Sequence, residues 1–183
     1  FIDAATITLN IQSIAVVDII DGTAKSAERY AGFAEKLTHV APSISIEQVN
    51  ATAYTRQAGK EAAMSFLQNT HYDAIYAIDD EVALGVLDAI NALNQINIKV
   101  LIGCGGEVNF MAKIKTNELP LLATTKYSPE MISKCINLAV KVLNKKGITK
   151  DNLVEVGLAI SRKNVDEATP SYPVPVGITE IKR

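Results

Sequence analysis

Short apolar runs alternate with longer segments of helical periodicity along this chain. The runs typical of buried strands are Ser13–Ile20, Ser43–Ala51, Asp73–Ile78, Ile98–Gly103, Leu121–Thr125 and Leu153–Ile160. Apolar residues recur with helical spacing in the segments between them, Ser26–Val40, Thr55–Asn69, Glu81–Leu93, Val108–Lys115 and Pro129–Lys145. Strands separated by helices of this length predict βαβ units, and therefore an α/β, Rossmann-like three-layer sandwich with a mostly parallel sheet.

This order of elements also predicts where a ligand would bind. Right-handed crossovers bring the C-terminal ends of parallel strands to one edge of the sheet. In open sheets of this kind, ligands bind in the crevice outside those ends. Polar and aromatic residues that directly follow the predicted strands are therefore the candidate site residues.

The composition and the cysteine pattern exclude several classes of protein. The 18 Lys and Arg against 20 Asp and Glu give a net charge of −2, which leaves no basic field for nucleic acid or anionic membrane. The longest apolar run, Ile14 to Ile20, is far shorter than a membrane span and is interrupted by Asp18. Cys104 and Cys135 form neither a disulfide scaffold nor a metal-ligand cluster. We expect that any signal peptide was removed before Phe1 or was never included in this sequence.

Catalytic motifs are not found. The sequence has no G-x-S-x-G, Walker A or H-E-x-x-H pattern, and its two histidines, His39 and His71, have no nucleophile paired with them. The stretch Gly103-Cys104-Gly105-Gly106 lacks the third glycine of a G-x-G-x-x-G fingerprint, so it indicates a tight strand-to-helix turn. We expect no enzyme activity, no catalytic residue and no cofactor.

The carboxylates of Asp79, Asp80 and Glu81 follow a predicted strand and allow two interpretations. They could hold Mg²⁺ in a small flavodoxin-like or receiver enzyme that uses Asp79 and Asp80. The simpler interpretation is that Asp79 or Asp80 caps the next helix, Asp80 being favoured, with Glu81 as a first-turn acid. Asp79 would then point into the crevice and accept hydrogen bonds from a polar ligand.

Three further residues suit a ligand with hydroxyl groups. Arg29 is predicted in the first turn of its helix, where a cation opposes the helix dipole, so its planar donor group is better explained by a polar partner. Tyr54 and Tyr127 follow strands, and an aromatic ring there suits the C–H face of a sugar.

Read together, these positions are similar to a known family. The matching stretches are, in chain order, Gly22-Thr23, Glu28-Arg29-Tyr30-Ala31-Gly32-Phe33, Tyr54-Thr55-Arg56-Gln57-Ala58-Gly59, Asp73-Ala74-Ile75-Tyr76-Ala77-Ile78-Asp79-Asp80-Glu81-Val82-Ala83-Leu84-Gly85, Val100-Leu101-Ile102-Gly103, Leu122-Ala123-Thr124-Thr125 and Ile160-Ser161-Arg162-Lys163-Asn164-Val165. They resemble the C-terminal half of type I periplasmic sugar-binding proteins of the ribose-binding group, and the regulatory core of LacI/GalR repressors. The resemblance covers nearly all of Ile14 to Pro170.

The resemblance implies two Rossmann-like lobes that close on a ligand between them. It implies that Arg29 bonds sugar hydroxyls, that Tyr54 lies at the cleft, and that Asp79 stands where the family usually has a sugar-binding asparagine. Tyr127 stands at the hinge, where ribose binders place a ligand-contacting glutamine. The ligand-binding residues expected from the resemblance are therefore Arg29, Tyr54, Asp79 and Tyr127.

The sequence also departs from the family pattern. Gly105 replaces the aspartate that normally anchors sugar hydroxyls, so one bidentate acceptor is missing, and Glu107 is a candidate to compensate. With Asp79 and Tyr127 also altered, these departures argue against ribose itself. They leave a small, polar, sugar-like ligand as the expectation.

The resemblance implies that the sequence lacks the family's N-terminal lobe. The expected organisation is a lead segment (1–12), a ligand-binding lobe (13–127), a helix that would pack on the absent lobe (128–146), a returning strand (147–161) and an extended tail (162–183). The helix would expose an apolar stripe of Met131, Cys135, Leu138 and Val142 unless the missing lobe or a second copy of the chain covers it.

These observations lead to one main hypothesis and two alternatives. The main hypothesis is the C-terminal lobe of a periplasmic or extracellular solute-binding protein, which would work with an ABC transporter permease or a membrane sensor. The first alternative is the effector-binding core of a LacI-type regulator, separated from its DNA-binding part. The second is the metal-dependent enzyme that uses Asp79 and Asp80.

Overall fold

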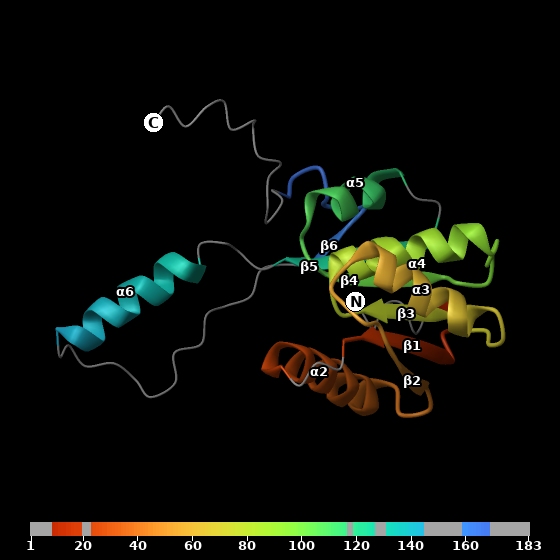
Figure 1. Cartoon of the computed structure of the whole chain (residues 1–183), viewed down its shortest axis with the longest axis horizontal. Helices are drawn as coiled ribbons and strands as arrows, with labels where there is room; N and C mark the ends of the chain where they lie inside the picture. Colours follow the sequence, from red (N-terminus) through yellow and green to blue (C-terminus); the bar gives the residue numbers. More distant parts are fainter. Residues whose placement is uncertain (1–8, 20–22, 117–118, 127–130, 145–158, 169–183) are drawn as a thin grey trace.

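A computed structural model describes residues 9–19, 23–116, 119–126, 131–144 and 159–168 of the chain (Figure 1). The strands are β1 (Ser13–Asp18), β2 (Ser45–Asn50), β3 (Ala74–Ala77), β4 (Val100–Gly105), β5 (Leu121–Lys126) and β6 (Ala159–Ser161). The helices are α2 (Ala24–Val40), α3 (Arg56–Leu67), α4 (Asp80–Ala92), α5 (Val108–Thr116) and α6 (Met131–Leu143). Each of them overlaps an element that the hydrophobic pattern predicts.

The strands form one sheet in the order β2-β1-β3-β4-β5-β6. Strands β1 to β5 pair in parallel, with Val16 opposite Tyr76 and Tyr76 opposite Ile102. Strand β6 is antiparallel to β5 and places Ile160 opposite Thr124. The mostly parallel sheet that the sequence predicts is confirmed. Because β1 to β5 run in one direction, their C-terminal ends lie along one edge, as expected.

Helices cover both faces of the sheet, but unequally. Figure 1 shows α2 on one side of the sheet and α3 and α4 on the other. Helix α5 shares the α4 face, because a Cβ at Gly103 would meet both Asp80 of α4 and Phe110 of α5. On the opposite face, the Phe33 ring of α2 stacks on the Tyr76 ring of β3 with their centroids 4.6 Å apart. The core therefore has two layers, one on each side of β1, β3 and β4.

Helices α3 and α4 approach closely at two glycines. A Cβ at Gly59 would overlap the backbone of Val82, and a Cβ at Gly85 would overlap the carbonyl oxygen of Arg56. The two helices are also joined at the surface by Arg56, whose Nε and Nη2 donate to the two carboxylate oxygens of Asp88 at 2.6 and 2.7 Å. This packing fixes the N-terminus of α4 at the C-terminal edge of the sheet.

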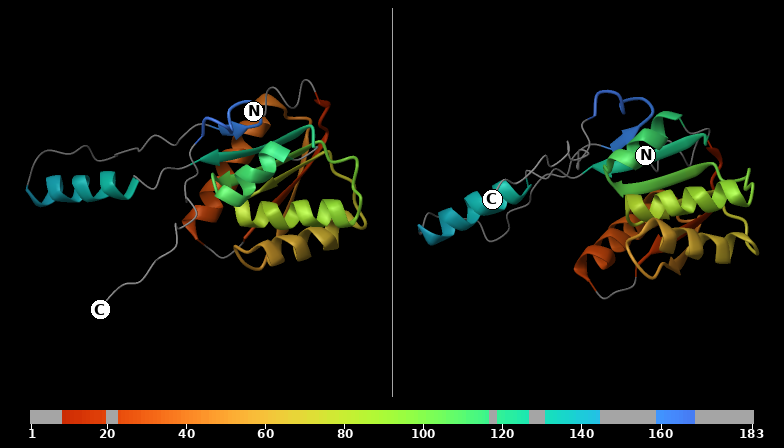
Figure 2. Two further views of the ribbon diagram at one scale, coloured as in Figure 1. Left: turned by 90° about the horizontal axis from the view of Figure 1, so that it is seen from above. Right: turned by 45° about the horizontal axis from the view of Figure 1, so that its top comes forward.

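Helix α6 stands apart from this body in both views of Figure 2. Ile136, Val140, Val142 and Leu143 are all exposed on it, the last to 81%. Of the stripe predicted from the sequence, Cys135 and Val142 are exposed and Leu138 is half-buried. The Met131 side chain lies outside the described residues.

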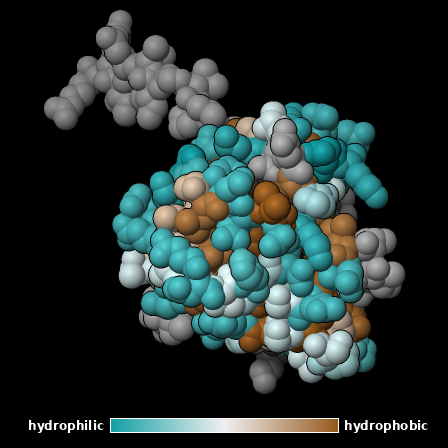
Figure 3. Space-filling model, turned by 90° about the vertical axis from the view of Figure 1, so that its right-hand side faces the viewer, coloured by the Kyte–Doolittle hydropathy of each residue, from teal (hydrophilic) through white to brown (hydrophobic). Residues whose placement is uncertain are grey.

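The face shown in Figure 3 is mostly hydrophilic, and its hydrophobic residues form small separate patches. Within the described residues, no helix combines the length and the apolar character needed to cross a lipid bilayer.

Candidate ligand-binding site

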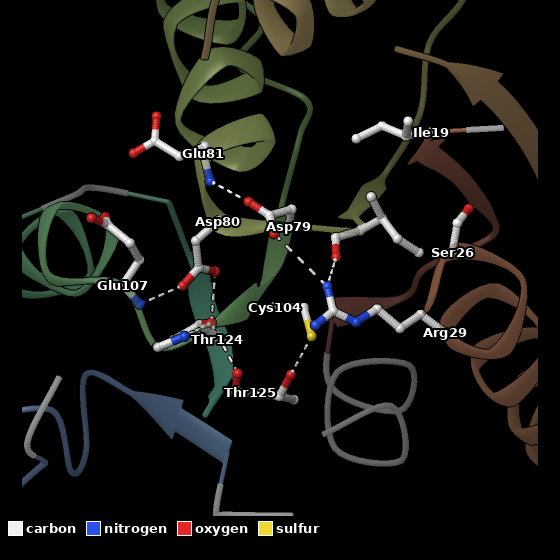
Figure 4. A network of polar contacts seen from close by, with 12 residues as sticks. Ile19, Ser26, Arg29, Asp79, Asp80, Glu81, Cys104, Glu107, Thr124 and Thr125 are labelled. Atoms are coloured by element: carbon white, nitrogen blue, oxygen red, sulfur yellow. Dashed lines mark hydrogen bonds and ion pairs between the residues drawn. The ribbon is translucent and has the colours of Figure 1, made fainter. Parts of the chain in front are cut away.

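Arg29 reaches the C-terminal edge of the sheet from helix α2. Its Nη1 donates a 2.7 Å hydrogen bond to the carbonyl oxygen of Ile78, the residue that follows β3. Figure 4 shows the side chain extending from α2 across to this strand end. The Arg29 side chain is 17% exposed, so it lies at the surface of the edge without being fully solvated.

The predicted position of Arg29 within its helix is wrong. Helix α2 begins at Ala24, with Thr23 as the N-cap whose side chain accepts from the backbone N–H of Ser26. Arg29 therefore lies in the second turn and not in the first, where the helix dipole would oppose it. Its orientation is explained by the carbonyl of Ile78 and not by the dipole.

Asp79 caps helix α4, which corrects the assignment of the cap to Asp80. One Asp79 oxygen accepts a 3.1 Å hydrogen bond from the backbone N–H of Glu81, and the other lies 3.8 Å from Nη1 of Arg29. The side chain of Asp79 is 19% exposed. A hydrogen-bond donor and an acceptor thus lie side by side, each partly open to solvent.

Asp80 points the other way, into the protein. Its carboxylate is buried at 1% exposure and accepts from the backbone N–H of Glu107 and from the hydroxyl of Thr124, both at 2.7 Å. Burial, with a smaller contribution from the charge of Asp79, raises the pKa of Asp80 to about 7. Asp80 is therefore a structural part of the edge and does not face a ligand.

Tyr54 lies after β2, on the far side of β1 from Asp79. Two strand spacings separate β2 from β3, or roughly 10 Å. The ammonium group of Lys25 lies 3.6 Å from the centroid of the Tyr54 ring. The Tyr54 hydroxyl is buried and has no hydrogen-bond partner among the described residues. One face of this ring is thus covered by a cation.

The position expected for a sugar-anchoring aspartate is part of a tight turn. Gly105 and Gly106 have φ values of +153° and +73°, which favour glycine, so the turn that the sequence predicts is confirmed. The Glu107 carboxylate accepts from the backbone N–H of Asn109 at 2.9 Å and from its side-chain amide at 3.3 Å. It therefore supports the start of α5. Tyr127 lies outside the described residues.

Sequence reasoning missed how Asp18 supports the site. This residue ends β1, is 2% exposed, and accepts from the hydroxyl of Ser26 at 2.7 Å and from the side-chain amide of Gln48 at 2.6 Å. It thereby holds the first turn of α2, the helix that carries Arg29. The sequence signal that could have revealed this role is Asp18 itself, an acidic residue that interrupts an apolar run at the end of a strand.

Helix α2 brings cations to the edge, and the starts of α4 and α5 bring carboxylates. Lys25 and Arg29 belong to α2. Asp79 and Glu81 lie at the N-terminal end of α4, and Glu107 directly precedes α5. Burial raises the pKa of Glu81, and the nearby charges of Glu107 and Asp79 contribute smaller increases. Within the described ranges, no three His, Cys, Asp or Glu side chains gather where a metal ion could be held. Because protein donors already occupy both Asp80 oxygens, the geometry does not support the metal-dependent alternative.

Comparison with known proteins identifies the family. The sequence model of the periplasmic binding protein domain matches residues 5–147, which is more than half of the chain. The chain belongs to the periplasmic binding protein domain family. No curated protein sequence matches it.

Solved structures of periplasmic binding proteins share the fold. An ABC transporter periplasmic solute-binding protein from Actinobacillus succinogenes, with bound D-allose, is 18% identical with a TM-score of 0.76, over 91% of this chain and 58% of that one. A solute-binding protein from Bacillus halodurans, with bound myo-inositol, is 21% identical with a TM-score of 0.74, over 90% and 56%. The fructose-binding periplasmic domain of a hybrid two-component system is 23% identical with a TM-score of 0.75, over 90% and 54%. This periplasmic binding protein domain therefore spans little more than half the length of these structures.

Proposed function

We propose that this chain is a ligand-binding lobe of a solute-binding protein, and that it takes a small, polar, sugar-like ligand at the C-terminal edge of the sheet. The observation that carries the proposal is the pair of Arg29 and Asp79, a partly exposed donor beside a partly exposed acceptor. Such pairs bind hydroxyl groups by charge-assisted hydrogen bonds. The bound D-allose and myo-inositol of the structural neighbours support a polyhydroxylated ligand.

The proposed roles are non-catalytic. Arg29 donates to ligand hydroxyls, Asp79 accepts from them, and the rings of Tyr54 and Tyr127 border the ligand. The Tyr54 hydroxyl, which is unpaired among the described residues, supports a place for that side chain near a polar group.

We also propose that a second lobe completes the site. The chain spans 58% and 56% of the first two neighbours, and α6 presents an exposed apolar surface. That helix would pack on the second lobe, while residues 13–127 form the lobe described here. Closure of the two lobes would signal to an ABC transporter permease or a membrane sensor, in the periplasm or outside the cell.

A thermal-shift screen tests the ligand. The chain is heated with D-allose, myo-inositol, pentoses and hexoses at millimolar concentration. A ligand at about 100 times its Kd adds about 2.7 kcal/mol to the free energy of unfolding, which raises the midpoint by several degrees. We expect at least one sugar or polyol to produce such a shift.

Matched variants assign the shift to the site. Arg29→Ala should abolish it, whereas Lys36→Ala, which removes an exposed cation from the same helix, should leave it unchanged. Asp79→Asn retains a side chain that can cap α4 and removes only the charge, so it should weaken the shift without abolishing it. An equal shift in Arg29→Ala would refute the proposed site, and the absence of any shift would refute ligand binding by this lobe without the second one.

A further inference from the structure

The carboxylate of Asp80 joins three elements at the binding edge. Its Oδ2 accepts from the backbone N–H of Glu107, in the turn between β4 and α5, at 2.7 Å. Its Oδ1 accepts from the hydroxyl of Thr124, on β5, at 2.7 Å. The same Thr124 oxygen accepts from the backbone N–H of Gly106 at 3.3 Å. Figure 4 shows the cluster between the start of α4 and the ends of β4 and β5.

The turn that follows β4 is shaped around this carboxylate. A Cβ at Gly103 would overlap Oδ1 of Asp80, and a Cβ at Gly105 would lie 3.3 Å from Oδ2. Gly105 and Gly106 also adopt positive φ values, so the chain turns where only glycine is unstrained. The Asp80 carboxylate thus occupies the space that side chains at positions 103 and 105 would otherwise fill.

The surroundings of Asp80 disfavour its charge. The titratable and charged groups near it are Asp79 and Glu81 on α4, Tyr76 on β3, Cys104 on β4, Glu107 in the following turn and, beyond Asp79, Arg29 on α2. Within the described part of the chain, no cation forms an ion pair with Asp80. Burial therefore dominates and raises the pKa of Asp80 to about 7.

The hydrogen bonds provide for both protonation states. The ionised carboxylate only accepts, and both Glu107 and Thr124 donate to it. A protonated acid must donate once. The backbone N–H of Glu107 cannot accept, whereas the Thr124 hydroxyl can, so the proton resides on Oδ1. The Thr124 hydroxyl hydrogen then turns to the carbonyl oxygen of Thr125, 3.5 Å away.

We propose that Asp80 is a proton-sensitive positioning residue whose protonation state sets the conformation of the Gly105–Glu107 turn. Ionisation strengthens the bond from the Glu107 N–H and directs the Thr124 hydroxyl toward Asp80. Protonation weakens the first bond and turns the hydroxyl away. The turn borders the edge that carries Arg29 and Asp79, so the shape of that edge depends on pH.

Nuclear magnetic resonance of the uniformly ¹⁵N-labelled chain tests this directly. The amide signals of Gly106 and Glu107 are followed from pH 5 to pH 9. We expect both to titrate with one midpoint near 7, and the Glu107 amide proton to move downfield as the pH rises. In Asp80→Asn, this titration should disappear. Flat signals in the parent chain, or an unchanged midpoint in Asp80→Asn, would overturn the proposal.

Two further variants keep the proposal testable if Asp80→Asn does not fold. Thr124→Val removes a donor to the ionised form, so the Glu107 midpoint should rise by about one pH unit. Glu107→Gln removes the turn's own carboxylate, and the titration should remain, with a midpoint equal to or slightly below that of the parent chain. An unchanged or lower midpoint in Thr124→Val, or loss of the titration in Glu107→Gln, would contradict the role of Asp80. None of these measurements needs a ligand, so their outcome is independent of the proposed sugar binding.

Discussion

Helices α4 and α6 are both 13 residues long and rich in apolar side chains, yet their surroundings are opposite. In α4, Val82, Ala83, Val86 and Ala89 are all fully buried against α3 and the sheet. In α6, Ile136 is 58% exposed, and the helix lies apart from the sheet (Figure 2). The comparison shows that an apolar stripe predicts a helix that needs a partner, and that the tertiary structure decides whether this chain contains one.

A matched pair of isoleucines tests this comparison most directly. Ile90 of α4 is 4% exposed, and Ile136 of α6 is 58% exposed. Ile90→Ala should lower the free energy of unfolding by about 3 kcal/mol, because it leaves a cavity in the core. Ile136→Ala should change it by less than about 0.5 kcal/mol. Urea denaturation measures both, and a large loss in Ile136→Ala would show that α6 packs on this lobe.

A matched pair of glycines tests how tightly α4 is held. Gly85→Ala should cost about 3 kcal/mol or more, because the new methyl group overlaps the backbone of α3 and neither helix can move away without disturbing the core. Gly32, at an exposed position of helix α2, has nothing within 4 Å of its Cβ position. Gly32→Ala should stabilise the chain by up to about 1 kcal/mol. Equal effects in thermal unfolding would contradict the close approach of α3 and α4.

The pH dependence of stability tests the buried end of α4. The folded-state pKa of Asp80, about 7, lies above the ordinary value of 3.8, so the folded chain retains a proton that the unfolded chain releases. The stability from this group is complete below pH 4 and is lost as the pH rises to about 7. Between pH 5 and pH 8 the loss should be about 3 kcal/mol.

Urea denaturation at several pH values measures the slope of unfolding free energy against pH in the parent chain and in two variants. Asp80→Asn should flatten it, because the amide does not titrate. Asp166→Asn, which removes a carboxylate from a side chain that is 81% exposed, should keep the parent slope. A slope that is the same in Asp80→Asn and in the parent chain would assign it to other groups.

The surface pair of Arg56 and Asp88 should have the smallest effect. Their bond is bidentate, but the two side chains are 48% and 31% exposed, so solvent screens it. A double-mutant cycle with Arg56→Ala and Asp88→Ala should give a coupling of about 0.5–1 kcal/mol. A coupling above 2 kcal/mol would mean that this ion pair is about as important for the packing of α3 on α4 as the close approach at Gly85.

Hydrophobic periodicity predicted the order and approximate bounds of the described elements, because burial repeats with the period of each element. It also placed Asp79 at the C-terminal edge, since Asp79 directly follows a strand of the parallel sheet, whereas the expected role of Arg29 came from the family resemblance. It did not reveal that Asp79 and not Asp80 caps α4. Two adjacent aspartates can each accept from the same free N–H groups, and only the position of Thr124 on a distant strand selects between them.

The sequence by itself determined the alternation of strands and helices, the glycine turn after β4 and the candidate residues at the strand ends, because these depend on local periodicity and backbone preference. The tertiary structure decided the contacts. It brought the Arg29 guanidinium to Ile78, buried Asp80 against Glu107 and Thr124, and left α6 uncovered. Those outcomes depend on which distant segments meet, and no local pattern in the chain encodes that.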